Sequence, residues 1–106
     1  MLDLSPTHLA EVRAILARHL PADCGVLVFG SRVKGRAKPY SDLDLALVGQ
    51  APLGLDCVGR LREAFAESEL PMRVDLLDWH QVPPAFRTLI AEEHEILVPP
   101  SPAHAA

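Results

Sequence analysis

The sequence predicts an α/β domain in which a mixed sheet of three to four strands is flanked by helices. Long stretches have apolar residues at helical spacing, short stretches between them are rich in strand-forming residues, and Pro or Gly marks most junctions. The resulting order, αβαβαβα, is typical of an α/β domain. The 106-residue length suits one domain. We expect it to comprise residues 1–98, followed by a disordered Pro/Ala tail over residues 99–106.

The first part of the chain predicts a helix, a strand and then a short helix or turn. Ser5 and Pro6 are typical of a helix start, with Ser as the N-cap and Pro at the first helical position. The helix is expected over residues 6–19, with an apolar stripe of Leu9, Val12, Leu16 and Leu20. Residues 26–29 predict a buried strand, and the polar residues 31–38 a short helix or turn.

The middle of the chain predicts a second strand and a second long helix. Residues 41–48 alternate between two sets that lie on opposite faces of a strand. One set is Leu43, Leu45 and Leu47, and the other is Asp42, Asp44 and Ala46. Residues 55–68 predict a helix, with an apolar stripe of Leu55, Val58, Leu61 and Phe65.

The last part predicts a third strand, a helix and an edge strand. The third strand is expected over residues 72–77. The helix opens at Pro83-Pro84 and ends near His94, and its inward side chains are expected to be Phe86, Leu89 and Ile90. Residues 96–98 predict a short edge strand.

Composition argues against some classes of function. A net charge of −4 and a pI near 5.6 argue against a protein that binds long nucleic acid by itself. The N-terminus lacks the layout of a signal peptide, and no apolar run is long enough to span a membrane. We therefore expect a cytoplasmic protein that is not bound to membranes, in which Cys24 and Cys57 are isolated core residues rather than a disulfide or metal site.

A candidate phosphate-binding bend, Gly30-Ser31, lies where the first strand ends. Backbone N–H groups at a helix start are free and partly positive, a Gly permits close approach of an anion, and a Ser hydroxyl adds a donor. For the bend alone, a plain turn with Ser31 as an N-cap is the favoured interpretation. The following residues do not complete a P-loop, because Gly35 is followed by Arg-Ala rather than by Lys and Ser or Thr.

Four basic residues follow this bend with no acidic residue among them: Arg32, Lys34, Arg36 and Lys38. Beside a phosphate-binding bend they would neutralise a triphosphate, whereas on their own they would form a solvated basic face. The candidate nucleotide-binding residues are Gly30, Ser31, Arg32 and Lys34.

Three Asp residues are the candidate catalytic and metal-binding groups. Asp42 and Asp44 are two apart, so both leave the same face of a strand and repel each other unless a cation is shared. Mg²⁺ suits such carboxylates and keeps positions for substrate phosphates, although Asp-x-Asp pairs also occur on exposed strands. Asp75 lies within an otherwise apolar strand and needs a partner. If the two strands are neighbours, three carboxylates converge, which is what phosphoryl transfer with two Mg²⁺ ions requires.

Other metal motifs are not supported. Asp42-x-Asp44 does not open an EF-hand, because the twelfth position is Leu53 and not Glu. The five His residues show no metal-binding spacing. Asp78 has the opposite strand parity to Asp75 and is not expected to join the carboxylates.

The combination of Gly30-Ser31-x-x-x-Gly35, Ser41-Asp42-x-Asp44-Leu45 and the later Asp75 resembles the polymerase β-like nucleotidyltransferase superfamily, and in particular its minimal (MNT-type) members paired with HEPN-domain toxins. The likeness covers about residues 5–98. It implies a Gly-Ser turn that binds nucleotide phosphates, metal binding by the Asp pair, and completion of the catalytic triad by the third Asp. It also implies transfer of AMP from ATP to a hydroxyl, which for toxin-paired members is a tyrosine of the HEPN partner.

We therefore expect a Mg²⁺-dependent adenylyltransferase that acts as an antitoxin on a HEPN-domain partner. The chain is too short to carry its own acceptor-binding domain, so a partner must present the hydroxyl. Two alternatives remain: a module that neutralises its partner by contact alone, and an adenylyltransferase for a small molecule. In the latter, a homodimer would build the pocket, whereas a toxin partner implies a hetero-oligomer.

Overall fold

The structure is a computed structural model that describes residues 2–35 and 41–99. The basic residues Arg36 and Lys38 and all of the expected tail after Pro99 lie outside the described residues. The helices are α1 (Pro6–His19), α2 (Ser31–Lys34), α3 (Leu55–Ala66) and α4 (Pro84–Glu92), with a 3₁₀ turn η1 (Trp79–Gln81). The strands are β1 (Gly25–Phe29), β2 (Leu43–Val48), β3 (Val74–Asp78) and β4 (Glu95–Val98).

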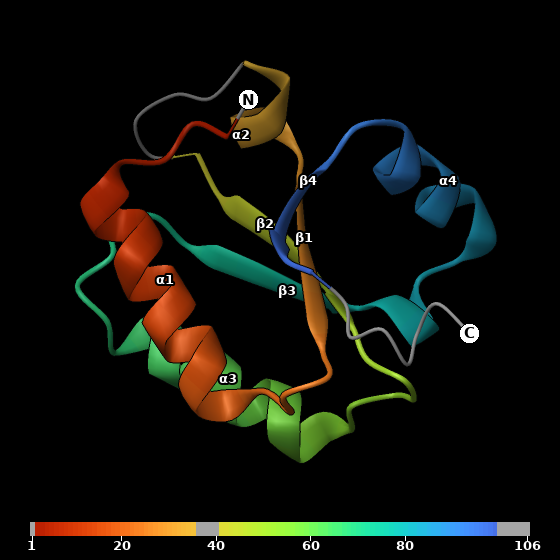
Figure 1. The fold of residues 1–106 in the computed structure, drawn as a ribbon, viewed down its shortest axis with the longest axis horizontal. Helices are drawn as coiled ribbons and strands as arrows, with labels where there is room; N and C mark the ends of the chain where they lie inside the picture. Colours follow the sequence, from red (N-terminus) through yellow and green to blue (C-terminus); the bar gives the residue numbers. More distant parts are fainter. Residues whose placement is uncertain (1, 36–40, 100–106) are drawn as a thin grey trace.

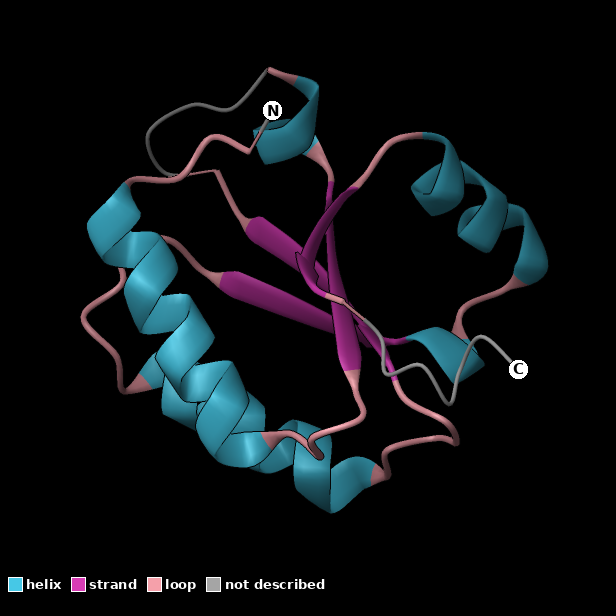
Figure 2. Cartoon of the chain, viewed as in Figure 1, coloured by secondary structure: helices cyan, strands magenta, loops and turns pink. Residues whose placement is uncertain are grey.

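The four strands form one mixed sheet in the order β3-β2-β1-β4 (Figures 1 and 2). β1 is antiparallel to both β2 and β4, whereas β2 and β3 are parallel. A parallel pair needs a long crossover, and α3 supplies it between β2 and β3. The expected α/β class and the four-strand alternative are confirmed, and β4 lies at the edge of the sheet as predicted.

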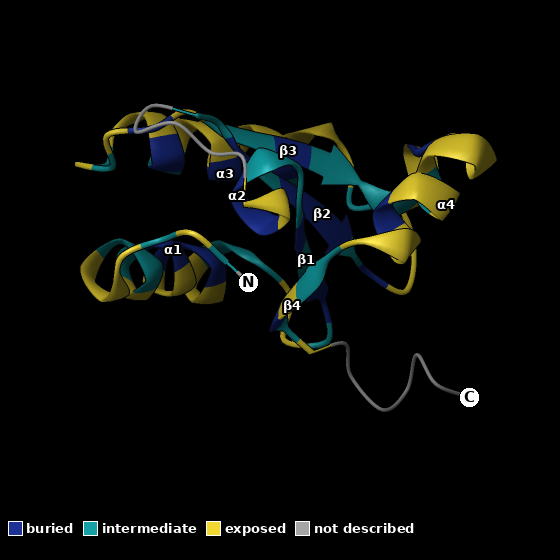
Figure 3. Cartoon of the chain, turned by 90° about the horizontal axis from the view of Figure 1, so that it is seen from above, coloured by how far each residue is buried: buried dark blue, intermediate teal, exposed yellow. Residues whose placement is uncertain are grey.

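The hydrophobic core fills the space between one face of the sheet and the helices α1 and α3. Figure 3 shows these two helices on one side of the sheet and α4 on the other. Leu43, Leu45 and Leu47 of β2 are completely buried in this core, so the predicted alternation of β2 is confirmed. α1 contributes Val12, Ile15 and Leu16, and α3 contributes Val58, Leu61 and Phe65.

The ends of the elements follow local chemistry. The Ser5 side chain accepts a hydrogen bond from the His8 backbone N–H (3.2 Å), and α1 begins at Pro6 as predicted. β2 begins at Leu43, one residue after Asp42, but the Leu43 N–H still donates to the Arg73 carbonyl (2.9 Å). The ladder therefore holds Asp42 beside the start of β3.

Three side chains expected to point inward are exposed to different degrees. Leu55 is 89% exposed because it is the first residue of α3, beyond the packed part of the helix. On α4, only Ile90 is buried, while Phe86 and Leu89 are 39% and 62% exposed. The predictions for Leu55 and Leu89 are wrong and that for Phe86 is only partly right, because α4 covers a limited part of the second face of the sheet.

In the part of the chain that the structure describes, no helix has the length and apolar character needed to cross a membrane.

Candidate active site

Three side chains form a row across the face of the sheet that α1 and α3 leave uncovered. Phe29 of β1 pairs with Asp44 of β2, and Asp44 pairs with Asp75 of β3. Residues that pair across neighbouring strands project from the same face. The third strand therefore brings its carboxylate directly beside that of the second strand, as the sequence predicts. Asp42 has the same parity as Asp44 and extends the group toward the start of β2.

The Gly30 bend lies against this row. Gly30 has a φ of +85°, a conformation that residues with a side chain rarely adopt. A β-carbon at this position would overlap Asp44 Oδ2. Glycine is thus required twice, for the backbone turn into α2 and for the close approach of the Asp44 carboxylate. The candidate anion-binding bend and the candidate metal ligands therefore share one site.

Arg73 is a member of the site that sequence analysis missed. Its Nη2 donates to Asp42 Oδ2 (3.0 Å) and is 3.4 Å from Asp75 Oδ2. The carboxylate of Asp42 and then that of Asp75 raise the pKa of the Arg73 guanidinium. The available signal was strand parity, because Arg73 and Asp75 are two apart and leave the same face.

The arrangement of the three acids disfavours the ionised form of Asp44. Partial burial, followed by the charges of Asp75 and Asp42, raises the pKa of Asp44 from 3.8 to about 6, while Arg73 lowers it. A divalent cation would relieve the same repulsion, because it favours the ionised form of all three acids. The donor set therefore fits Mg²⁺, which prefers carboxylate oxygens.

The side chains are not gathered around a common point. Among the described residues, no group of three or more His, Cys, Asp or Glu side chains is placed to hold a metal ion. Instead, the Arg73 guanidinium forms ion pairs with both Asp42 and Asp75. The strands thus bring the three acids to one face, and side-chain rotation is needed for all of them to meet one cation.

Arg32 has a different place from the one expected for a nucleotide-binding residue. It is only 5% exposed, and its Nε and Nη1 donate to the carbonyl oxygens of Ser41 (3.0 Å) and Asp3 (2.9 Å). A buried guanidinium committed to backbone carbonyls is not presented to a nucleotide. Its position instead connects α2 to the segment that precedes Asp42. Sequence reasoning missed this because charge alone suggested solvent exposure.

Ser31 and Lys34 remain in place for ligand contact. Ser31 is partly exposed directly after the Gly30 bend, and Lys34 is exposed at the end of α2. A pocket of about 480 Å³ starts at Gly30 and Lys34. Its remaining walls are Phe29, Phe86, Leu89, Ile90, Glu92 and Glu93. Phe29 and Phe86 meet edge to face, with their ring centroids 5.9 Å apart. The pocket thus combines a cation and a bend at one side with an aromatic and apolar wall on α4.

Asp78 has a structural role. Its Oδ2 accepts from the Leu53 N–H (2.8 Å), and its Oδ1 accepts from the His80 N–H (3.1 Å). These contacts hold the loop after β2 against η1. The prediction that Asp78 stays apart from the other acids agrees with this placement.

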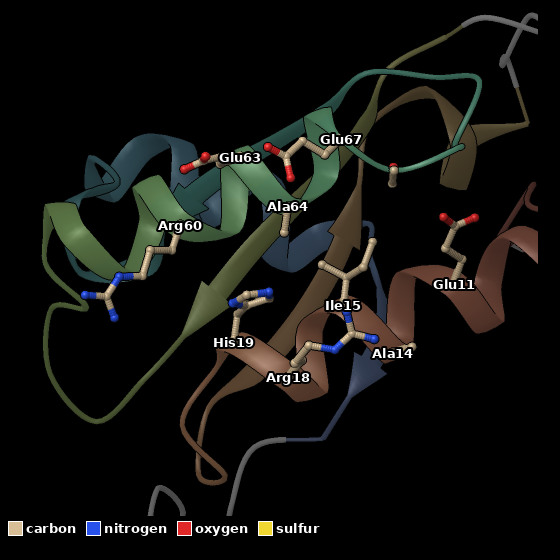
Figure 4. Close-up of a pocket in the computed structure, with 10 residues that line it drawn as sticks. Glu11, Ala14, Ile15, Arg18, His19, Arg60, Glu63, Ala64 and Glu67 are labelled. Carbon is tan, nitrogen blue, oxygen red and sulfur yellow. The ribbon is translucent and has the colours of Figure 1, made fainter.

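A second hollow of about 480 Å³ lies between α1 and α3, away from the three acids. Figure 4 shows Arg18, His19 and Arg60 toward one part of this groove and Glu11 and Glu67 toward another. Its lining contains no member of the site described above.

The fold and the acids on its open face define a nucleotidyltransferase. The family model described as "Polymerase beta, Nucleotidyltransferase" matches residues 12–102. The chain belongs to this family. It is 49% identical over 96 residues to the "Probable protein adenylyltransferase MntA" of Haemophilus influenzae. The aligned region covers 91% of this chain and 83% of that protein.

Two solved structures share the fold. One is a toxin–antitoxin with AMP-PNP, with a TM-score of 0.72 and 22% identity, covering 84% of this chain and 71% of that one. The other is a tri-AMPylated Shewanella oneidensis HEPN toxin in complex with MNT antitoxin, with a TM-score of 0.64 and 21% identity, covering 84% of this chain and 67% of that one.

Proposed function

We propose that this chain is an adenylyltransferase antitoxin, which transfers AMP from ATP to a hydroxyl of a HEPN-domain toxin, and that this hydroxyl belongs to a tyrosine. The observation that carries the proposal is the register of β2 and β3, which pairs Asp44 with Asp75 beside the Gly30 bend. The similarity to MntA and the AMPylated HEPN toxin in a related complex support the class of reaction and of partner.

Asp42, Asp44 and Asp75 would hold Mg²⁺, with two ions as the expected number. When bound, Mg²⁺ neutralises the triphosphate and stabilises the charge on the leaving pyrophosphate. Asp75 lies on the edge strand β3, and its side chain is half-exposed. It would accept the hydroxyl proton as the new bond between oxygen and the α-phosphorus forms and the bond to pyrophosphate breaks.

The nucleotide would be held by α2 and α4 together. Gly30, Ser31 and Lys34 supply backbone and side-chain donors for phosphate oxygens. We assign the nucleoside to the pocket beside them, because its far wall is apolar and ends in Glu92 and Glu93. Those carboxylates repel phosphate but accept hydrogen bonds from an amino or hydroxyl group. Arg32 would position Asp42 through its bond to the Ser41 carbonyl rather than touch ATP.

We place the reaction in the cytoplasm, where ATP is available. In that reducing compartment we expect Cys24 and Cys57 to remain thiols.

Neutralisation by contact alone is the second candidate function, and the exposed apolar side chains Leu89 and Ile96 favour it. Adenylylation of a small molecule is less well supported, because the similarity to MntA and the AMPylated HEPN toxin of a related complex favour a protein acceptor.

The deciding experiment incubates the chain with α-labelled ATP, Mg²⁺ and the HEPN-domain protein encoded beside it. We expect label on that protein and none when the Asp42→Asn, Asp44→Asn double variant is used. The matched control is Asp78→Asn, which alters an acid outside the site and should keep the transfer. Absence of label from an intact complex would overturn the enzymatic proposal. Full toxin neutralisation by the double variant at equal dose would instead establish the contact mechanism.

A further inference from the structure

Arg73 makes two ion pairs with the acids on the open face of the sheet. One nitrogen, Nη2, lies 3.0 Å from Asp42 Oδ2 and 3.4 Å from Asp75 Oδ2. Arg73 comes directly before β3, and its carbonyl accepts from the Leu43 N–H (2.9 Å). The backbone bond anchors the residue beside the start of β2, and its side chain spans the two strands.

These ion pairs are easily exchanged. The Arg73 side chain is 73% exposed, and those of Asp42 and Asp75 are 38% and 47% exposed. Exposed ion pairs contribute little to stability, because water and salt compete for both partners. Arg32 provides the contrast within this chain, since it is buried and bonded to two backbone carbonyls. Arg73 can therefore leave its partners at small cost, whereas Arg32 cannot.

We propose that Arg73 is an internal counter-ion that competes with the divalent cation for Asp42 and Asp75. This inference rests on the proposed function, because it assigns these acids to metal binding. A guanidinium and a metal ion compete for the negative charge of the same carboxylates, so binding of one disfavours binding of the other. Asp42 and Asp75 both pair with Arg73, so each can exchange this partner for a cation.

The competition has a definite consequence for the protein. Arg73 limits repulsion among the three acids and thereby supports the fold. For the same reason it weakens the binding of a cation to Asp42 and Asp75. A purely structural ion pair would support the fold without opposing the cation.

The test compares the full chain with the variant Arg73→Met, which keeps the length of the side chain and removes its charge. Mn²⁺ binding is measured by electron paramagnetic resonance and calorimetry without nucleotide, and thermal unfolding is measured in EDTA. We expect Arg73→Met to bind Mn²⁺ about fivefold more tightly and to unfold at a lower temperature in EDTA. Arg60→Met is the control, since it removes the same charge from the groove between α1 and α3 (Figure 4), and it should leave Mn²⁺ affinity unchanged.

The outcomes separate this inference from the proposed function. Equal or weaker Mn²⁺ binding by Arg73→Met, with the wild-type chain binding normally, would overturn the role of Arg73 alone. An equal gain in Arg60→Met would also overturn it, because overall charge would then explain the effect. A wild-type chain that binds no Mn²⁺ even with ATP would remove the metal site, and the proposed reaction with it.

Discussion

Asp44 is the residue at which function and stability conflict most directly. Its carboxylate is partly buried between two other acids, and its pKa is raised to about 6. A group whose pKa is raised on folding binds protons more readily in the folded state, so its ionisation above that pKa lowers stability. The site therefore contains a charge that the fold would be more stable without.

The substitution Asp44→Asn should separate the two effects. We expect it to lower the rate of AMP transfer by at least about 100-fold, because a candidate metal ligand is lost. At pH 7 in EDTA it should raise the free energy of unfolding by roughly 1 kcal/mol, after allowance for solvent screening. Transfer assays and urea denaturation test both. An Asp44→Asn protein that is less stable and equally active would contradict this account of the site.

Gly30 allows a sharper comparison, because Gly35 offers a matched control. Both glycines have positive φ, +85° and +73°, but a β-carbon at Gly30 overlaps the Asp44 carboxylate, whereas one at Gly35 meets no atom of the described residues within 4 Å. Each change to Ala should cost about 1 kcal/mol of stability. Only Gly30→Ala should also displace Asp44 and lower the transfer rate, by about 100-fold. Equal activities of the two variants would show that the close approach of Gly30 and Asp44 is unimportant.

At this scale the sequence identifies the acids better than the bases. Asp42, Asp44 and Asp75 are recognisable because acidic residues are rare in apolar strands, and strand parity places them on one face. Arg32 is expected to bind nucleotide but is buried against backbone carbonyls, and Arg73 lies at the acids although no role is expected for it from the sequence. Hydrogen bonding to distant backbone carbonyls buries Arg32, and only the pairing of β2 with β3 brings Arg73 to Asp42.

At the scale of elements, α4 combines a buried side with an exposed side that lines the pocket. It packs on the sheet through Ile90 and leaves Leu89 62% exposed, and Leu89 also lines the pocket that begins at Gly30. A surface residue can be changed here without disturbing the core. The helix thus allows a test of nucleoside binding that is independent of the fold.

We expect Leu89→Ala to weaken ATP binding about fivefold, through loss of roughly 1 kcal/mol of apolar contact with the nucleoside. Binding of inorganic tripolyphosphate should be nearly unchanged, because it reaches only the bend and Lys34. Leu55→Ala is the control, at a residue 89% exposed on α3. Titration calorimetry with both ligands measures the difference. Equal weakening for ATP and tripolyphosphate would contradict the placement of the nucleoside against α4.

The elements themselves are largely predictable, and the errors have a common cause. Helical periodicity and capping residues locate α1 to its first residue, because the signals are local. The stripe pattern cannot show how far a packed surface extends, so Leu55 and Leu89 are expected inside but lie beyond it. Which strands pair, and the parallel direction of β2 and β3, follow from the tertiary arrangement rather than from the strands' own residues.

For the whole molecule, one face of the sheet packs in the hydrophobic core and the other face carries the candidate catalytic acids. Leucines of β2 point into the core under α1 and α3, while the alternate residues carry the acids on the open face. Cys24, just before β1, is part of the hydrophobic core and is 3% exposed. Burial, then the charges of Cys57, Asp23 and Asp78, raises the pKa of the Cys24 thiol from 9.0 to about 11.

This shift predicts how global stability responds to alkali. Between pH 9 and about 11 the unfolded chain loses the Cys24 proton while the folded protein keeps it, so the free energy of unfolding falls as pH rises through that range. The expected loss from this group is roughly 2 kcal/mol, about the value of such a pKa shift. Cys24→Ala removes the group, so urea denaturation at pH 8 and pH 10.5 should show a smaller loss in the variant than in the wild-type chain. An identical loss in both would mean that the thiol ionises in the folded state as easily as in water, and that the core beside β1 is open to solvent.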